Sequence, residues 1–171
     1  MAALATPTRA PASVGATELR LTRPMPAKAT PIVAAVDDSS ASRGVVQTAV
    51  RLAAELNLQL VFVYVRRGPP GFLGTPFFQR RLTAKMTRAR RAVDRALSAA
   101  AQAGVDAESE ILEGAPRTRI LQLASDRDAA RLIVVGSRRR RFSRSVSCGV
   151  LRAAEGPVVV AGSRPLLADV R

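Results

Sequence analysis

The sequence contains no histidine and no tryptophan, and its single cysteine is Cys148. The absence of histidine excludes Ser-His-Asp and Cys-His triads, zinc sites of the HExxH kind and any imidazole acid or base. One cysteine cannot close a disulfide within the chain, which is typical of a protein from a reducing compartment. Many hydrolase mechanisms are therefore excluded, and we expect Cys148 to be a small buried residue rather than a reactive thiol.

Long apolar runs are also missing, because the longest, at 58–65, is far shorter than the roughly 18 residues that a membrane-spanning helix needs. With 171 residues, 47% of them hydrophobic, the chain is long enough for one core and too short for two ordinary domains. We expect a single soluble domain at 31–162, with a disordered tail at 1–30 and a short tail at 163–171.

The first 30 residues have no apolar stretch of the kind found in a secretory signal. We therefore expect a cytoplasmic protein. The alternative is an organelle, because a leader that carries arginine and has one acidic residue, Glu18, resembles a transit peptide.

Lysine is nearly absent as well: among 27 basic residues, only Lys28 and Lys85 are lysines, and the net charge is +14. About +10 of this charge lies between residues 31 and 162, so it is not confined to a tail. Such a field attracts nucleotides, nucleic acid or anionic lipid. The alternative is that arginine reflects a GC-rich genome and that the charge mainly confers solubility.

Short apolar runs alternate with helical periods, a pattern typical of βα units that form a parallel sheet. The predicted strands are 31–36, 58–65, 106–112, 131–136 and 157–162. The first, second and fourth are nearly continuous apolar runs, as expected for strands covered on both faces, whereas the third alternates and should lie nearer an edge. The sequence predicts a single α/β domain with an open five-stranded parallel sheet and helices on both faces, a Rossmann-like arrangement.

Four helices are predicted between these strands. In the first, Val45, Ala49, Leu52 and Leu56 recur on one face, and Ser39 or Ser40 is placed to cap its start. The third begins near Pro116, a favoured first-turn residue, and the fourth occupies 145–154. The Gly- and Pro-rich segment 66–75 is interpreted as a surface loop.

The longest predicted helix, at 77–103, has an apolar face and an arginine face. The apolar stripe consists of Phe78, Leu82, Met86, Ala89, Val93, Ala96 and Ala100. The opposite side carries Arg80, Arg81, Arg88, Arg91 and Arg95.

Ligands of open parallel sheets bind at the carboxyl ends of the strands, where the winding direction reverses. A reversal between the first and fourth strands would place Asp37 and Asp38 beside residues 136–144. The Asp37 carboxylate could accept hydrogen bonds from a ribose hydroxyl or an adenine amino group; the alternative is an Asx turn or a helix cap. We expect Asp38 to be a loop residue or a cap, because no further carboxylates for a metal site are near.

After the fourth strand, Gly136 and Ser137 are followed by four arginines at 138–141 and lead into the start of the last helix. Backbone N–H groups, the helix dipole and arginine side chains suit a phosphate there. The alternative is a solvated charged loop.

Residues 32–65 and 132–160 resemble the universal stress protein family, and the resemblance extends over 31–162. It implies a fold of the adenine nucleotide α-hydrolase type, with Asp37 contacting adenine or ribose and Val65 packing near adenine. It also implies a homodimer paired through the last strand, 157–162. Nucleotide-binding members of the family carry G-x2-G-x9-G-[S/T] after the fourth strand.

This chain departs from that motif. Gly136 matches the first glycine, but Arg139 stands at the second, Arg144 and Ser145 stand at the last pair, and the loop is about five residues short. Glycines let phosphate oxygens approach the backbone, so arginine side chains obstruct that route. We therefore expect nucleotide binding to be weak or lost. The candidate pocket for ATP or AMP consists of Asp37, Val65, Gly136, Arg138, Ser145 and Val146.

The resemblance implies a non-enzymatic stress-response or regulatory domain that acts through an unidentified protein partner. One alternative is an ATP- or AMP-binding regulatory module whose arginines hold the phosphates. Another is a nonspecific binder of nucleic acid or anionic surfaces, using the arginine face of 77–103 and the loop 138–141. We expect no enzyme and no metal site, because ATP hydrolysis needs a carboxylate-held metal and a group that orients water.

Overall fold

The computed structural model describes residues 30–67, 76–126, 130–137 and 145–162, with side chains from residue 79 onward in the second helix. The elements are β1 (Ile32–Val36), α1 (Ala41–Leu56), β2 (Leu60–Arg66), α2 (Pro76–Gln102), β3 (Ala107–Glu113), α3 (Pro116–Asp126), β4 (Leu132–Gly136), α4 (Val146–Ala153) and β5 (Val158–Ala161). Strands and helices alternate, as the sequence predicts.

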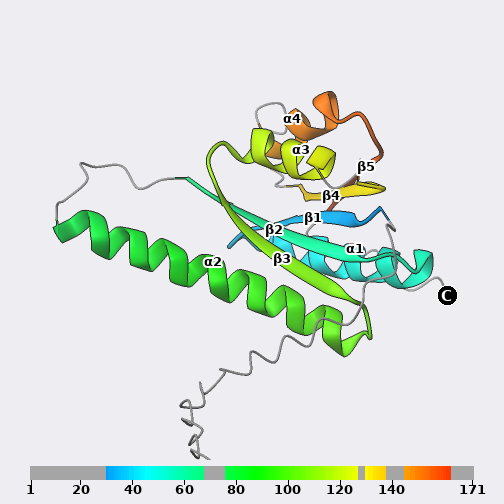
Figure 1. Ribbon diagram of the computed structural model, residues 1–171, viewed down its shortest axis with the longest axis horizontal. Helices are drawn as coiled ribbons and strands as arrows, with labels where there is room; N and C mark the ends of the chain where they lie inside the picture. Colours follow the sequence, from blue (N-terminus) through cyan, green and yellow to red (C-terminus); the bar gives the residue numbers. More distant parts are fainter. Residues whose placement is uncertain (1–29, 68–75, 127–129, 138–144, 163–171) are drawn as a thin grey trace, which may run out of the picture.

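The five strands form one parallel sheet in the order β3-β2-β1-β4-β5. The chain winds outward from β1 to β3 and then in the opposite direction through β4 to β5, so the winding reverses between β1 and β4. Helices α1 and α2 cover one face of the sheet, and α3 and α4 cover the other (Figure 1). The predicted α/β domain, its covered parallel sheet and the edge position of β3 are confirmed.

Side chains of the central strands alternate between two apolar layers. Ile32, Leu60, Phe62 and Val134 pack with α1 and α2. Val33, Val61, Val63, Ile133 and Val135 pack with α3 and α4. Both faces of the central strands are covered by apolar side chains, and this explains why these strands are nearly continuous apolar runs.

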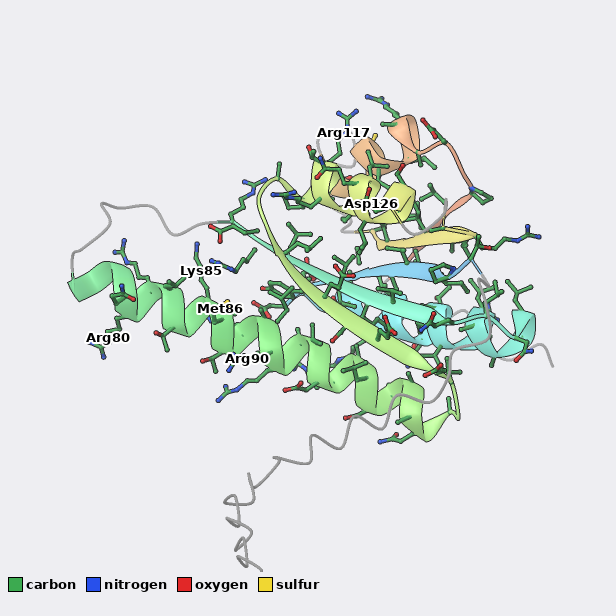
Figure 2. All side chains as sticks on the ribbon, in the orientation of Figure 1. Arg80, Lys85, Met86, Arg90, Arg117 and Asp126 are labelled. Carbon is green, nitrogen blue, oxygen red and sulfur yellow. The ribbon has the colours of Figure 1, made fainter. Side chains whose placement is uncertain are left out.

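Helix α2 has the predicted two faces. Ala89, Val93, Ala96 and Ala100 are buried, and Leu82 and Met86 are half-buried. The five predicted arginines, Arg80, Arg81, Arg88, Arg91 and Arg95, are all exposed. The amino-terminal part of the helix extends beyond the sheet, and Arg80 and Arg90 point away from it (Figures 1 and 2). Phe78 lies outside the described side chains.

Two local expectations need correction. Arg66, expected at the start of a loop, is the last residue of β2, because it pairs in register with Glu113 of β3. Leu56, expected on the apolar face of α1, is 51% exposed, because it ends the helix just before Asn57 turns the chain with a φ of 52°. The rest of the predicted loop, at 68–75, and the predicted tails at 1–29 and 163–171 lie outside the described residues.

The start of α3 at Pro116 and the start of α4 just after Ser145 agree with the sequence. Across the described ranges, no helix combines the length and the apolar character that crossing a membrane requires.

Candidate functional site

Asp37 follows β1 and organises the turn that leads into α1. Its Oδ1 accepts hydrogen bonds from the Ser39 backbone N–H at 2.8 Å, the Ser39 hydroxyl at 2.5 Å and the Ser42 hydroxyl at 3.1 Å. The Asp37 N–H in turn donates to Ser42 Oγ at 2.6 Å. This is the Asx-turn arrangement, one of the two alternatives for this carboxylate.

The prediction that the side chain of Ser39 or Ser40 caps α1 needs correction. Ser40 occupies the N-cap position but makes no side-chain capping bond. The Ser39 hydroxyl donates to Asp37 instead of accepting from a helix N–H. The turn before α1 is therefore held by the Asp37 carboxylate together with Ser39 and Ser42, and Ser40 supplies no side-chain cap.

Asp38 is exposed beside this turn, and its Oδ2 accepts a hydrogen bond from the Tyr64 hydroxyl at 3.1 Å. Burial raises the pKa of Tyr64 to about 12, with further contributions from the Asp38 charge and hydrogen bond and from Asp37, while Arg88 acts in the opposite direction. The phenol is therefore a protonated donor at neutral pH. Tyr64 lies next to Val36 in the parallel register, which is the signal that could have linked it to the turn after β1.

Gly136 ends β4 and lies against the first turn of α1. A Cβ atom there would lie 3.1 Å from Val45 Cγ2 and 3.2 Å from Ala41 Cβ. Its carbonyl accepts a hydrogen bond from the hydroxyl of Ser147, a buried polar residue of α4. Ser147 carries no signal in the sequence, because its role depends on this contact with a residue eleven positions away.

Ser145 caps α4: its hydroxyl accepts a hydrogen bond from the Cys148 N–H at 3.2 Å. Cys148 is buried in α4, as predicted, with 5% of its surface exposed. Val146, the next residue after the cap, is 37% exposed. Within the described part of the chain, no three acidic or cysteine side chains gather as a metal site would require.

A family model described as the universal stress protein family matches residues 28–162. The chain belongs to this family. The resemblance of 31–162 to universal stress proteins is thereby confirmed, and solved structures agree with it.

A universal stress protein family member from Burkholderia pseudomallei is 27% identical, covering 77% of this chain and 94% of that one with a TM-score of 0.64. The universal stress protein from Archaeoglobus fulgidus in complex with dAMP is 26% identical, covering 78% and 98%, with a TM-score of 0.60. One from Lactobacillus plantarum shares the fold at 24% identity, covering 77% and 97%, with a TM-score of 0.68. No curated protein sequence matches the chain.

In this universal stress protein, Asp37 and Gly136 both lie against the first turn of α1, through Ser42 and Ala41. They meet at the predicted reversal between β1 and β4. Val65 is half-buried in the apolar layer that α3 and α4 cover, on the other face of the sheet from α1. Ser145 is the N-cap of α4, and Val146 is the first residue of that helix. Arg138, together with the rest of the arginine run, lies outside the described residues.

Proposed function

We propose that this universal stress protein is a non-catalytic stress-response or regulatory domain whose binding of adenine nucleotides between β1 and β4 is weak or lost. The observation that carries the proposal is the set of hydrogen bonds that the Asp37 carboxylate accepts. Its Oδ1 already accepts three hydrogen bonds from Ser39 and Ser42. A ribose or adenine donor that approaches Oδ1 would have to compete with these contacts, and losing them would open the turn that starts α1.

The departures from the glycine motif support the same proposal. The dAMP-bound protein from Archaeoglobus fulgidus is a relative in which a nucleotide is present. In this chain, arginines stand at two of the three glycine positions that the nucleotide-binding motif requires. We therefore expect arginine side chains to obstruct the close approach of phosphate oxygens to the backbone.

The absence of catalysis is proposed from the chemistry of the residues. The chain has no histidine. The two carboxylates after β1 accept hydrogen bonds from Ser39, Ser42 and Tyr64. Neither arrangement resembles a carboxylate set that holds a metal beside a water-orienting base.

Calorimetric titration with AMP and dAMP, at low and at physiological salt, tests the proposal. A duplex oligonucleotide serves as the control for general attraction of anions. We expect any heat at low salt to vanish at physiological salt for both kinds of ligand. Salt-resistant, stoichiometric AMP binding that Asp37→Ala or Ser145→Ala abolishes, and that Asp126→Ala on α3 leaves intact, would instead establish the alternative of a nucleotide-binding regulatory module.

A second candidate function, nonspecific binding of nucleic acid or another anionic surface, is favoured by the arginine face of α2. All five arginines of that face are exposed, and the helix extends beyond the sheet (Figure 1). Such binding would fall steeply as salt rises and would show no sequence preference. A weak salt dependence of oligonucleotide binding would reject it.

The proposal includes a cytoplasmic homodimer. The lone Cys148 suits a reducing location. Strand β5 pairs with β4 on one side, and Val158, Val159 and Val160 are half-buried. An apolar strand edge invites pairing with another strand.

A further inference from the structure

A cleft lies on the face that α3 and α4 cover, at the carboxyl ends of the strands. It has a volume of about 350 Å³ and brings together the residue after β2, the start of α3 and the exposed side of α4. Its lining includes Arg67, Arg117, Arg152, Ser145, Pro116 and Gly149. Three of its lining residues are arginines, and none is acidic.

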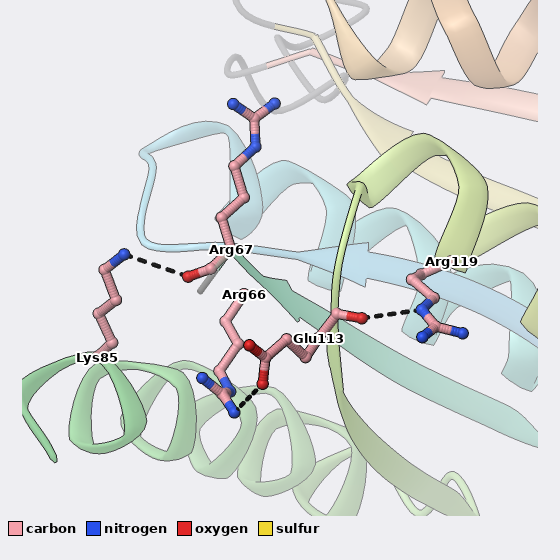
Figure 3. A network of polar contacts seen from close by, with 5 residues as sticks. All are labelled: Arg66, Arg67, Lys85, Glu113 and Arg119. Carbon is pink, nitrogen blue, oxygen red and sulfur yellow. Dashed lines mark hydrogen bonds and ion pairs between the residues drawn. The ribbon is translucent and has the colours of Figure 1, made fainter. Parts of the chain in front are cut away.

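The three arginines reach the cleft for separate reasons. Side chains alternate along β2, so Arg66 points toward α2 while Arg67 points to the other side (Figure 3). The Arg67 carbonyl accepts a hydrogen bond from Lys85 Nζ at 3.2 Å, which ties the backbone of this residue to α2. The guanidinium of Arg67 is left on the side of α3 and α4.

Arg117 lies across α4 at a position where α4 has no side chain. A Cβ atom at Gly149 would lie 2.9 Å from Arg117 Cδ, so glycine is what lets the arginine extend over the helix. Arg152 follows Gly149 by three residues and therefore lies on the same side of α4. The Cγ, Cδ and Nε atoms of Arg117 lie beside Gly149 of α4, and Arg117 and Arg152 both line the cleft.

The arginine charges in the cleft have no ion-pair partner among the described residues. Glu113, at the end of β3, is paired with Arg66. Among the described residues, the side chains of Arg67, Arg117 and Arg152 take part in no ion pair or hydrogen bond. Three like charges in one cleft repel each other, and a bound anion would remove that repulsion.

The charge and shape suit phosphate in particular. Guanidinium groups form paired, charge-assisted hydrogen bonds with phosphate oxygens. Two helices, α3 and α4, begin at the cleft, so the positive ends of their dipoles add to the arginine charges. We propose that the cleft of Arg67, Arg117 and Arg152 is a polyphosphate site, which binds free polyphosphate or the phosphate tail of a nucleotide through side chains. The cleft shares Ser145 and Val146 with the candidate nucleotide pocket, but its three arginines do not belong to that pocket and the site does not involve Asp37. The proposal therefore goes beyond the proposed function and does not depend on it.

The test is calorimetric titration of the full chain with inorganic tripolyphosphate at physiological ionic strength. We expect saturable binding that Arg117→Gln/Arg152→Gln weakens by about tenfold or more, because each lost guanidinium removes charge-assisted hydrogen bonds. The matched control, Arg91→Gln/Arg95→Gln, removes the same charge from the exposed face of α2 on the other side of the sheet. We expect it to change the affinity by less than about twofold.

Arg67→Gln provides a second variant, because no described contact of its side chain supports the fold. It should weaken tripolyphosphate binding as well, and it decides the question if the double variant has lost its cooperative thermal transition. Absent binding, binding that none of the three arginines affects, or an equal loss in the α2 control would overturn the site.

Titrations with ATP and with adenosine distinguish free polyphosphate from the phosphate tail of a nucleotide as the ligand. They also distinguish a failure of this site from a failure of the proposed function. ATP should displace tripolyphosphate, and adenosine should not. If only tripolyphosphate binds, the site holds and takes free polyphosphate. If ATP binding requires Asp37 and adenosine competes, the proposed loss of nucleotide binding fails, while the arginine variants still decide the cleft with tripolyphosphate.

Discussion

Gly136 has no room for a side chain. The missing Cβ would approach Val45 Cγ2 at 3.1 Å and Ala41 Cβ at 3.2 Å, and both neighbours are buried. Val45 is β-branched and restricted in rotation, so it cannot turn away from the new methyl group. We expect Gly136→Ala to lower the free energy of unfolding by about 1–3 kcal/mol, measured by urea denaturation.

Gly156 provides the control for this substitution. A Cβ there would meet its nearest atom, the Ala130 carbonyl oxygen, at 3.7 Å, an ordinary contact. Gly156→Ala should therefore leave the free energy of unfolding within about 1 kcal/mol of the original value. Equal stability of the two variants would mean that β4 and α1 separate easily, against the close contact described for Gly136.

Tyr64 reports on the turn after β1. It is the single tyrosine in a chain without tryptophan, so the absorbance of the phenolate can be assigned to one residue. Burial, together with Asp38 and Asp37, raises its pKa to about 12. We expect Asp38→Asn to lower the pKa of Tyr64 toward 10.0 in a spectroscopic titration, because the substitution removes a negative charge and leaves the burial.

The raised pKa of Tyr64 also makes the stability of the fold depend on pH. Because the folded-state pKa of Tyr64 exceeds its ordinary value of 10.0, its contribution to folding is complete below pH 10.0 and is lost as pH rises through about 12. Asp38→Asn should reduce this alkaline loss. Asp126→Asn, on the opposite face of the sheet, should not move the titration, and an unchanged curve in Asp38→Asn would leave burial as the cause.

At the scale of elements, the ends of β2 and β3 are joined by Arg66 and Glu113. The Arg66 side chain is 18% exposed and that of Glu113 is 53% exposed. Arg66 Nη2 donates to Glu113 Oε2, while Nη1 is buried without a hydrogen-bond partner among the described residues. Among the described residues, the Glu113 carboxylate is thus the group that compensates the positive charge of Arg66.

We expect Glu113→Gln to destabilise the fold by about 1–2 kcal/mol, because it leaves a largely buried cation uncompensated. In a variant that already carries Arg66→Met, Glu113→Gln should lower the free energy of unfolding by much less. A double-mutant cycle by chemical denaturation measures the difference. Additive effects would show that the pair contributes no more than an exposed surface pair does.

Elements are also the level at which prediction from sequence succeeded best. Apolar runs such as 131–136 report burial on both faces, and burial is a local property of a central strand. Arg66 was misplaced because its burial depends on Glu113, which is 47 residues away. The cleft arginines Arg67, Arg117 and Arg152 were missed for the same reason: three segments supply them, and each one alone resembles an ordinary exposed charge.

Asp37 illustrates the corresponding limit for the candidate site. Its position after a buried strand was enough to predict that it lies where the winding reverses. The sequence left open whether the carboxylate faces a ligand or its own turn. The positions of Ser39 and Ser42 around Oδ1 show that the carboxylate faces its own turn. The sequence could not show this, because both serines lie within five residues of Asp37 whether they contact it or face solvent.

At the scale of the whole molecule, β5 determines how two copies could pair. The carbonyls of Pro157 and Ala161 accept hydrogen bonds from Ile133 of β4 and from Ser137, the residue after β4. Because backbone groups of successive residues point to opposite sides of a strand, those of Val158 and Val160 face the open edge. A second copy that adds its own β5 there would use these groups.

We therefore expect the protein to be a dimer by light scattering and Val160→Pro to be a monomer. Proline removes an N–H from the open edge and leaves the hydrogen bonds to β4 in place, so the thermal transition should survive. Val160→Ala keeps that N–H and shortens the same side chain, and it should remain dimeric. If Val160→Pro is still a dimer, the copies meet elsewhere; a monomeric wild type means that β5 is an unpaired edge, and then its short length of four residues is what limits aggregation.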